Sequence, residues 1–72
     1  MKKINKIKIK LNGKIIKTQE QITLQNLIKK HNIPIKKVAI ELNQAIVNKK
    51  LIGKIKIKKN DKIEIVHFIG GG

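Results

Sequence analysis

The strict alternation of charged and apolar side chains through residues 6–11 constrains the fold more than any other feature of this sequence. Successive side chains of a β-strand point to opposite faces, so the isoleucines and leucine would share one face and the lysines the other. Asn12-Gly13 follows at once and favours a type I′ turn, whose two central residues need positive φ angles. We therefore predict a β-hairpin, with its second strand over about residues 14–18.

After Thr23 the apolar spacing changes from two residues to three and four. This spacing indicates an amphipathic helix of about two turns over residues 24–31. Thr23 is a suitable N-cap because its hydroxyl can accept a hydrogen bond from a free backbone N–H. Asn32 tolerates the left-handed conformation that often follows a helix, and Pro34 prevents continuation.

The second half of the chain contains three runs that read as strands: a buried strand over 38–42, a short strand over 45–47 and a last strand over 62–68. Between them lies the lysine-rich segment 48–59. Within it, residues 54–58 alternate lysine with isoleucine, and we predict an edge strand whose lysines protect it from aggregation.

The predicted order is hairpin, helix, strand pair, loop and final strand. One helix that covers the apolar face of a mixed sheet gives a two-layer α+β domain. This order, followed by glycines, matches the β-grasp or ubiquitin-like architecture. We expect one domain over residues 1–69 and a flexible glycine tail over residues 70–72.

The 72-residue chain has 18 basic residues, all of them lysine, four acidic residues and a net charge of +14. Such a charge attracts nucleic acids and other anions. Arginine, which reads guanine and phosphate with two hydrogen bonds, is absent, and Phe68 is the only aromatic among Phe, Tyr and Trp. We therefore expect a solvated lysine face and no specific nucleic-acid partner, with a nonspecific nucleic-acid-binding module as the alternative of another class.

Several other functional classes are disfavoured by the sequence. Cysteine is absent, so the chain has no thiol for a disulfide, a metal site or sulfur chemistry. The four acids are scattered, and His31 and His67 lack a nucleophile or orienting partner, so we predict neither catalytic residues nor a metal site. No apolar run reaches the length of a membrane span or a signal peptide, and we expect a soluble monomer.

The three glycines of residues 70–72 follow the last predicted strand without a polar spacer. Without a Cβ atom, glycine can pass through a slot too narrow for other residues. The α-carboxylate of Gly72 would be the reactive group, with Gly70 and Gly71 as its tether. In the strand, alternation from inward isoleucines places Val66 and Phe68 on the opposite face, and we predict that they bind a partner together with Ile69.

Three segments resemble the ThiS family, the sulfur carrier proteins of thiamine biosynthesis. They are Leu11-Asn12-Gly13, Glu41-Leu42-Asn43 with Ile46-Val47, and above all the block from Asp61 to Gly72, which reads DKIEIVHFIGGG. The resemblance covers nearly the whole chain. Asn60 departs from it, because the family commonly has glycine before this aspartate.

The resemblance implies a cycle at Gly72. A ThiF-like adenylyltransferase would use ATP and magnesium to adenylate the carboxylate, so this chain would bind no cofactor. A sulfur donor, ultimately a cysteine desulfurase, would convert the adenylate into a thiocarboxylate, and a ThiG-like thiazole synthase would accept the sulfur. The molybdopterin-synthase small subunit and ubiquitin-related modifiers are the alternatives within the fold. The expected location is a bacterial cytoplasm or a plastid stroma.

Overall fold

The N-terminal hairpin forms as the alternation predicts. The computed structural model describes residues 5–68, in which β1 (Lys6–Leu11) pairs antiparallel with β2 (Lys14–Gln19). Asn12 and Gly13 have φ angles of 52° and 82°, the positive values that a type I′ turn requires. The lysines of β1 are exposed, whereas its apolar residues are buried or partly buried.

The helix α1 (Leu24–Lys30) begins and ends on the predicted signals. The Thr23 hydroxyl accepts a hydrogen bond from the backbone N–H of Asn26 at 3.1 Å, which satisfies one of the free donors at the helix start. The helix ends at Lys30, one residue earlier than predicted, and His31 is its C-cap. Asn32 follows with a φ of 54°, the left-handed conformation that asparagine tolerates.

The remaining elements complete the sheet and its connections. Three are strands, and two are short 3₁₀ helices: η1 (Ile35–Lys37), β3 (Val38–Leu42), β4 (Ala45–Ile46), η2 (Lys49–Leu51) and β5 (Lys62–His67). The predicted strands at 38–42, 45–47 and 62–68 are confirmed, the last two ending one residue earlier than predicted.

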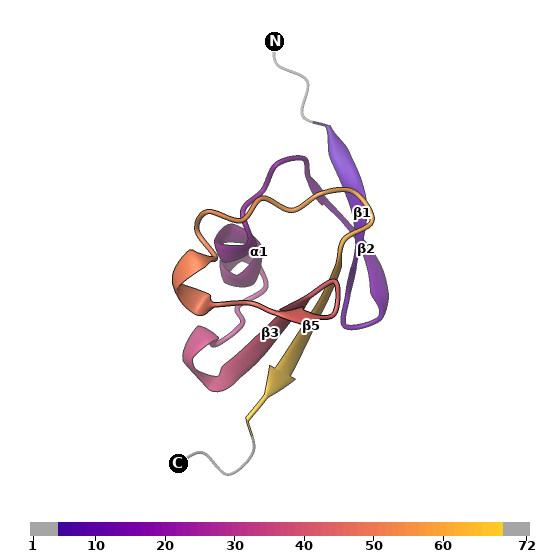
Figure 1. Ribbon diagram of the computed structural model, residues 1–72. Helices are drawn as coiled ribbons and strands as arrows, with labels where there is room; N and C mark the ends of the chain where they lie inside the picture. The colour runs from indigo at the N-terminus through magenta and orange to yellow at the C-terminus, as the bar shows by residue number, and fades with distance from the viewer. Residues whose placement is uncertain (1–4, 69–72) are drawn as a thin grey trace.

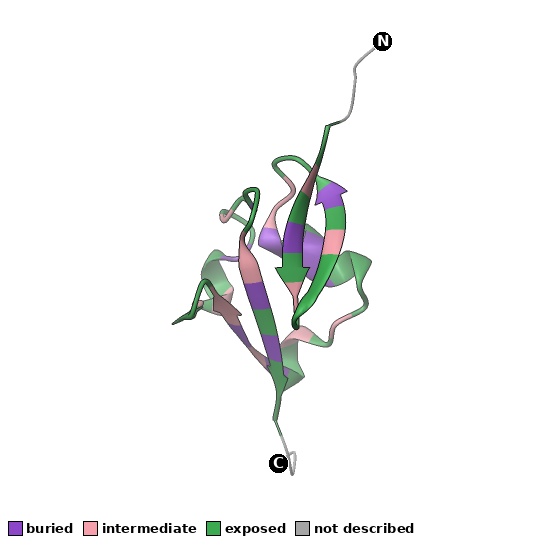
Figure 2. Ribbon diagram, turned by 90° about the vertical axis from the view of Figure 1, so that its right-hand side faces the viewer, coloured by how far each residue is buried: buried purple, intermediate pink, exposed green. Residues whose placement is uncertain are grey.

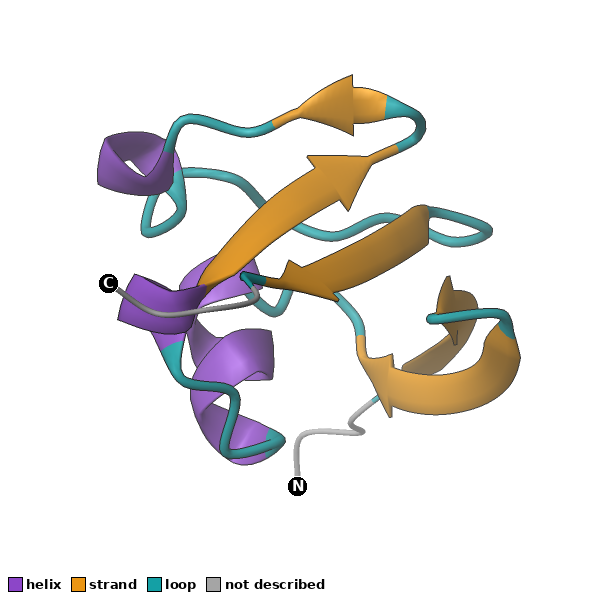
Figure 3. Ribbon diagram, turned by 90° about the horizontal axis from the view of Figure 1, so that it is seen from below, coloured by secondary structure: helices purple, strands orange, loops and turns teal. Residues whose placement is uncertain are grey.

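The five strands form one mixed sheet in the order β2-β1-β5-β3-β4, in which β1 and β5 are parallel and the other neighbours antiparallel. The helix α1 packs on one face of this sheet (Figures 1 and 3), which confirms the predicted α+β architecture. The buried hydrophobic residues of the core between these two layers are Ile9, Leu24, Leu27, Ile28, Val38, Ile40, Ile52, Ile57, Ile63 and Ile65. Among the described residues, Thr18 is the one buried polar residue. We call the sheet face opposite α1 the outer face.

The predicted edge strand at residues 54–58 is wrong. The segment makes one isolated bridge, between Lys56 and Thr23, and the described sheet has β2 and β4 at its edges. Its backbone bonds go to the start of the helix: Ile55 accepts from the N–H of Leu24 at 2.8 Å. Ile57 is 1% exposed and lies in the core. The alternation of lysine and isoleucine in this segment therefore reflects burial of isoleucine rather than pairing in the sheet.

Two asparagine side chains fix the position of β5. The Asn12 Oδ1 accepts a hydrogen bond from the backbone N–H of Ile65 at 2.7 Å, just beyond the two register pairs of β1 with β5. The Asn43 Oδ1 accepts from the N–H of Lys62 at 2.9 Å, and its Nδ2 donates to Asp61 Oδ1 at 3.0 Å. The start and the middle of β5 are therefore tied to turns that are distant in sequence.

Candidate functional site

The last strand, β5, places its side chains in the predicted phase. Ile63 and Ile65 are 0% and 8% exposed and contribute to the core, whereas Val66 and Phe68 are 50% and 58% exposed. Figure 2 shows buried and exposed residues alternating along this strand. The predicted outward orientation of Val66 and Phe68 is confirmed. Their role in binding a partner stays a prediction.

Phe68 is held at the end of β5 although its ring is exposed. The last register pair of β5 with β3 joins His67 to Val38, and the backbone N–H of Phe68 then donates to the Lys37 carbonyl at 2.9 Å. The ammonium nitrogen of Lys49 lies 5.2 Å from the centre of the Phe68 ring, within the range of a cation–π contact. The backbone is therefore anchored up to the residue that precedes Ile69 and the glycines.

Sequence reasoning missed Lys37 and Lys49. Both lie in lysine-rich runs, and nothing in their local pattern distinguishes them from the other lysines. Their positions depend on η1 and η2, two 3₁₀ helices that come next to Phe68 only when the chain folds.

Around Val66, the outer face of the sheet carries exposed apolar side chains next to two carboxylates. Val66 is opposite Ala39 in the register, and the next row joins Glu64 to Glu41 and Glu41 to Ile46. Ile46 is 78% exposed. We call Ile46, Val66 and Phe68 the β4–β5 apolar patch. A large exposed aromatic with apolar neighbours has the character of a protein-binding surface.

The predicted reactive residue, Gly72, lies outside the described residues, as do Ile69, Gly70 and Gly71. The structure therefore gives the position of Phe68, the residue that precedes these four. Fully extended, four residues span at most about 14 Å. Any chemistry at the Gly72 carboxylate must therefore take place within about that distance of Phe68.

Both histidines lie at the ends of secondary-structure elements. His31 is the C-cap of α1, and His67 is the last residue of β5.

Within residues 5–68, no group of three or more His, Cys, Asp or Glu side chains is placed to hold a metal ion. No helix in that described part of the chain has the length and apolar character needed to span a membrane.

Comparison with known proteins identifies the family. The ThiS family profile matches residues 3–72, almost the whole chain. The sulfur carrier protein ThiS of Bacillus subtilis is 37% identical over 65 residues, which cover 89% of this chain and 98% of that protein. An uncharacterized protein ycf40 of Porphyra purpurea is 34% identical over 70 residues, covering 96% of this chain and 99% of that protein.

A larger relative matches only in part. A thiazole synthase of Magnetococcus marinus is 39% identical over 66 residues, which cover 92% of this chain but 20% of that protein. The chain thus spans about a fifth of the length of this relative.

A solved structure agrees with the fold. The crystal structure of the thiamine biosynthesis protein ThiS from Geobacter metallireducens superposes with a TM-score of 0.82, covering 92% of this chain and all of the other at 23% identity. The fold matches this β-grasp structure, and the profile and the Bacillus relative cover almost the full length of the chain. The chain therefore belongs to the ThiS family of sulfur carrier proteins of thiamine biosynthesis.

Proposed function

We propose that this chain carries sulfur as a thiocarboxylate on Gly72 and delivers it for formation of the thiazole ring of thiamine. The observation that supports this most directly is the anchored, exposed end of β5 at Phe68, four residues before Gly72, in a chain whose family match extends to residue 72. An anchored strand end fixes the origin of the tail, and three glycines let it enter a narrow catalytic channel. The folded body supplies docking, and the partner enzymes supply catalysis.

The first step is activation of the Gly72 carboxylate. A carboxylate is a poor electrophile, so a ThiF-like adenylyltransferase would use Mg-ATP: a carboxylate oxygen attacks the α-phosphorus, and pyrophosphate leaves. The acyl adenylate then has AMP as a good leaving group. ATP and magnesium would belong to that enzyme rather than to this chain.

The second step replaces oxygen with sulfur. A persulfide, supplied ultimately by a cysteine desulfurase or another donor, would attack the acyl carbon and release AMP. Reductive cleavage of the resulting acyl disulfide by a thiol, which is oxidised in the process, then leaves the Gly72 thiocarboxylate. Because this chain has no cysteine, every thiol in the sequence of reactions must come from a partner.

A ThiG-like thiazole synthase is the proposed acceptor of the sulfur. Two relatives named thiazole synthase, from Magnetococcus marinus and Paramagnetospirillum magneticum, each contain a segment similar to this chain within a much longer protein. That arrangement supports a carrier and a synthase acting on each other. Relatives in Bacillus subtilis and Porphyra purpurea fit either proposed location, a bacterial cytoplasm or a plastid stroma.

The test is ATP–pyrophosphate exchange with the cognate adenylyltransferase. Deleting Gly72 leaves a terminal glycine but shortens the reach by about 3.5 Å, and adding an alanine after Gly72 lengthens it by the same amount. Misplacement by about 1 Å can cost about 100-fold in rate, so both variants should lose at least that much exchange activity. Circular dichroism should show both folded as wild type, because the changes lie beyond the anchored residue Phe68.

Two outcomes decide the proposal. Near-normal exchange in both variants would show that Gly72 is not the acceptor. Intact mass spectrometry of the chain from its own cells provides an independent check, since the thiocarboxylate replaces one oxygen with sulfur at the C-terminus. A sulfur-containing form that is lost when Gly72 is deleted supports the carrier cycle.

A further inference from the structure

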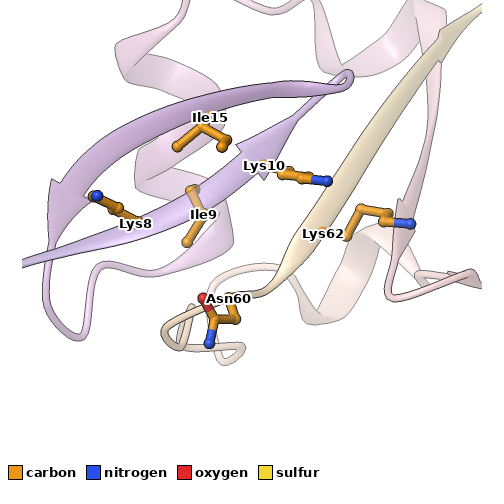
Figure 4. A pocket seen from close by; sticks show the side chains of 6 residues that line it. All are labelled: Lys8, Ile9, Lys10, Ile15, Asn60 and Lys62. Carbon is orange, nitrogen blue, oxygen red and sulfur yellow. The ribbon is translucent and has the colours of Figure 1, made fainter.

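A second feature of the outer face lies away from the β4–β5 apolar patch. An open pocket of about 260 Å³ is formed where β1 runs between β2 and β5, and its lining consists of Lys8, Ile9, Lys10, Ile15, Asn60 and Lys62. Figure 4 shows that the lysines come from two neighbouring strands, β1 and β5, with Ile15 above them on β2. We call it the lysine pocket.

The lysine pocket brings like charges together. Lys10 is opposite Lys62 in the parallel register of β1 and β5, and Lys8 is opposite Lys17 in the antiparallel register of β1 and β2. Like charges directly opposite each other on neighbouring strands destabilise a sheet. An anion bound from outside beside Lys10 and Lys62 would relieve the repulsion between these two lysines.

The nearest acid in sequence is already occupied. Asp61 is next to Lys62, but its Oδ1 accepts from Asn43 at 3.0 Å and its Oδ2 accepts from the backbone N–H of Lys58 at 2.8 Å. Both carboxylate oxygens thus serve the turn before β5. Asp61 therefore directs its carboxylate oxygens to this turn rather than to the ammonium groups of the pocket.

The chemistry of the pocket favours a carboxylate over a free phosphate. Phosphate sites commonly use converging backbone N–H groups. Here the N–H of Lys10 donates to the Asp61 carbonyl at 2.9 Å, that of Asn60 to the Lys8 carbonyl at 2.8 Å, and that of Lys62 to Asn43 Oδ1 at 2.9 Å. These three backbone N–H groups are therefore occupied, and the lysine ammonium groups, with the side-chain amide of Asn60, are the charged and polar groups that line the pocket.

The pocket also offers apolar area. Ile15 is 66% exposed at its wall, and the aliphatic stems of the lysines add to this surface. A small inorganic ion would leave Ile15 in water, whereas an acidic side chain on a protein surface brings apolar neighbours that can cover it. A partner protein therefore fits both properties of the pocket.

We propose that the lysine pocket receives an aspartate or glutamate side chain, with an apolar neighbour, from the surface of the thiazole synthase. This inference rests on the proposed function, which names that partner. Lys8, Lys10, Val66 and Ile46 all project from the outer face, so one protein lying on this face would cover both the pocket and the β4–β5 apolar patch. Because the lysine pocket and the β4–β5 apolar patch lie at different parts of this face, the partner can dock in one orientation only. That orientation then determines where the tail is presented to the partner.

The experiment compares two double variants that remove the same charge. Lys10→Gln/Lys62→Gln neutralises the pocket, and Lys30→Gln/Lys54→Gln neutralises two exposed lysines at the end of α1 and in the loop after η2. Affinity for the purified thiazole synthase is measured by titration calorimetry over a salt series. The pocket variant should bind about tenfold more weakly at low salt with a smaller salt dependence, and the control should change by less than about twofold.

Zero-length carbodiimide cross-linking supplies the direct evidence, because this reagent joins an amine to a carboxylate. Cross-linked peptides that pair Lys10 or Lys62 with an acidic residue of the synthase are expected. Equal losses of affinity in both double variants, or cross-links confined to lysines outside the pocket, would overturn the inference. A saturable response of these lysines to inorganic phosphate in the free chain, measured by NMR, would also overturn it.

The failure of the proposed function is distinguishable from the failure of this inference. If wild-type chain is adenylated at Gly72 and binds the synthase, but the two double variants behave alike, only the pocket assignment is wrong. If wild-type chain neither supports pyrophosphate exchange nor binds the synthase, the proposed function fails and the pocket assignment fails with it.

Discussion

Replacing Phe68 with alanine should separate docking from folding. The backbone hydrogen bond from residue 68 to the Lys37 carbonyl survives the change, because it uses only the main chain. The lost contacts are the cation–π contact with Lys49, about 0.5–1 kcal/mol at an exposed site, and the partly buried side of the ring. We expect the free energy of unfolding to fall by about 1–2 kcal/mol, against about 3–5 kcal/mol for a phenylalanine removed from a core.

The expected effect on docking is larger. A phenylalanine side chain buries roughly 200 Å² when fully covered, and Phe68 is 58% exposed, so about 115 Å² remains for a partner. At about 25 cal/mol per Å², covering this area contributes at most about 3 kcal/mol, or roughly 100-fold in affinity. We therefore expect Phe68→Ala to weaken binding to the adenylyltransferase or the synthase by about 10- to 100-fold.

Urea denaturation measures the first effect, and titration calorimetry with each enzyme measures the second. Phe68→Leu is the matched control: it retains much of the apolar area and should recover most of the affinity while losing the cation–π contact. Lys49→Gln removes that contact from the other side and should leave docking within a few-fold of wild type. An unfolded Phe68→Ala protein would contradict the assignment of Phe68 to the surface, and normal binding by a folded one would refute its role as an anchor.

Two further predictions concern the scaffold that positions this strand end. Asn43→Ala loses two side-chain hydrogen bonds and places alanine, which disfavours the left-handed conformation, at a φ of 52°, so we expect the free energy of unfolding to fall by about 2–3 kcal/mol in urea denaturation. Asn43→Gly loses the same hydrogen bonds, but glycine tolerates that φ, so its loss should be about 1 kcal/mol smaller. Equal losses in the two variants would show that the backbone angle contributes nothing. Ile40 is 0% exposed at the centre of β3, so Ile40→Ala should lower the free energy of unfolding by about 2–5 kcal/mol. Ile46 is 78% exposed, so Ile46→Ala should change it by less than about 0.5 kcal/mol. Similar losses at both positions would contradict the assigned core.

The elements that the sequence predicts correctly depend on short-range rules. The turn at Asn12-Gly13 and the cap at Thr23 each involve residues within a few positions of each other, and the structure confirms both. The phase of Val66 and Phe68 also follows from alternation within a single strand. Local patterns were enough for these features because the physical cause is itself local.

The features that the sequence does not predict depend on contacts between distant residues. Residues 54–58 have the same alternation as β1, yet their backbone bonds to the start of α1, and Ile57 is buried in the core. The contact of Lys49 with Phe68 and the convergence of Lys10 and Lys62 likewise join residues far apart in sequence. In a chain with 18 lysines, position in the fold alone distinguishes the few that form a site.

The alternating pattern of β5 also makes its register a functional matter. A slip of one residue would turn the isoleucines out of the core, but a slip of two residues would leave Ile63 and Ile65 on the core side. Such a slip would move Phe68, and with it the tail, by about 6.6 Å along the strand, whereas misplacement by about 1 Å can abolish efficient reaction. The hydrogen bonds of Asn12 to Ile65 and of Asn43 to Lys62 are specific to one register and oppose this slip. Asn12 and Asn43 therefore help to determine where the Gly72 carboxylate can reach.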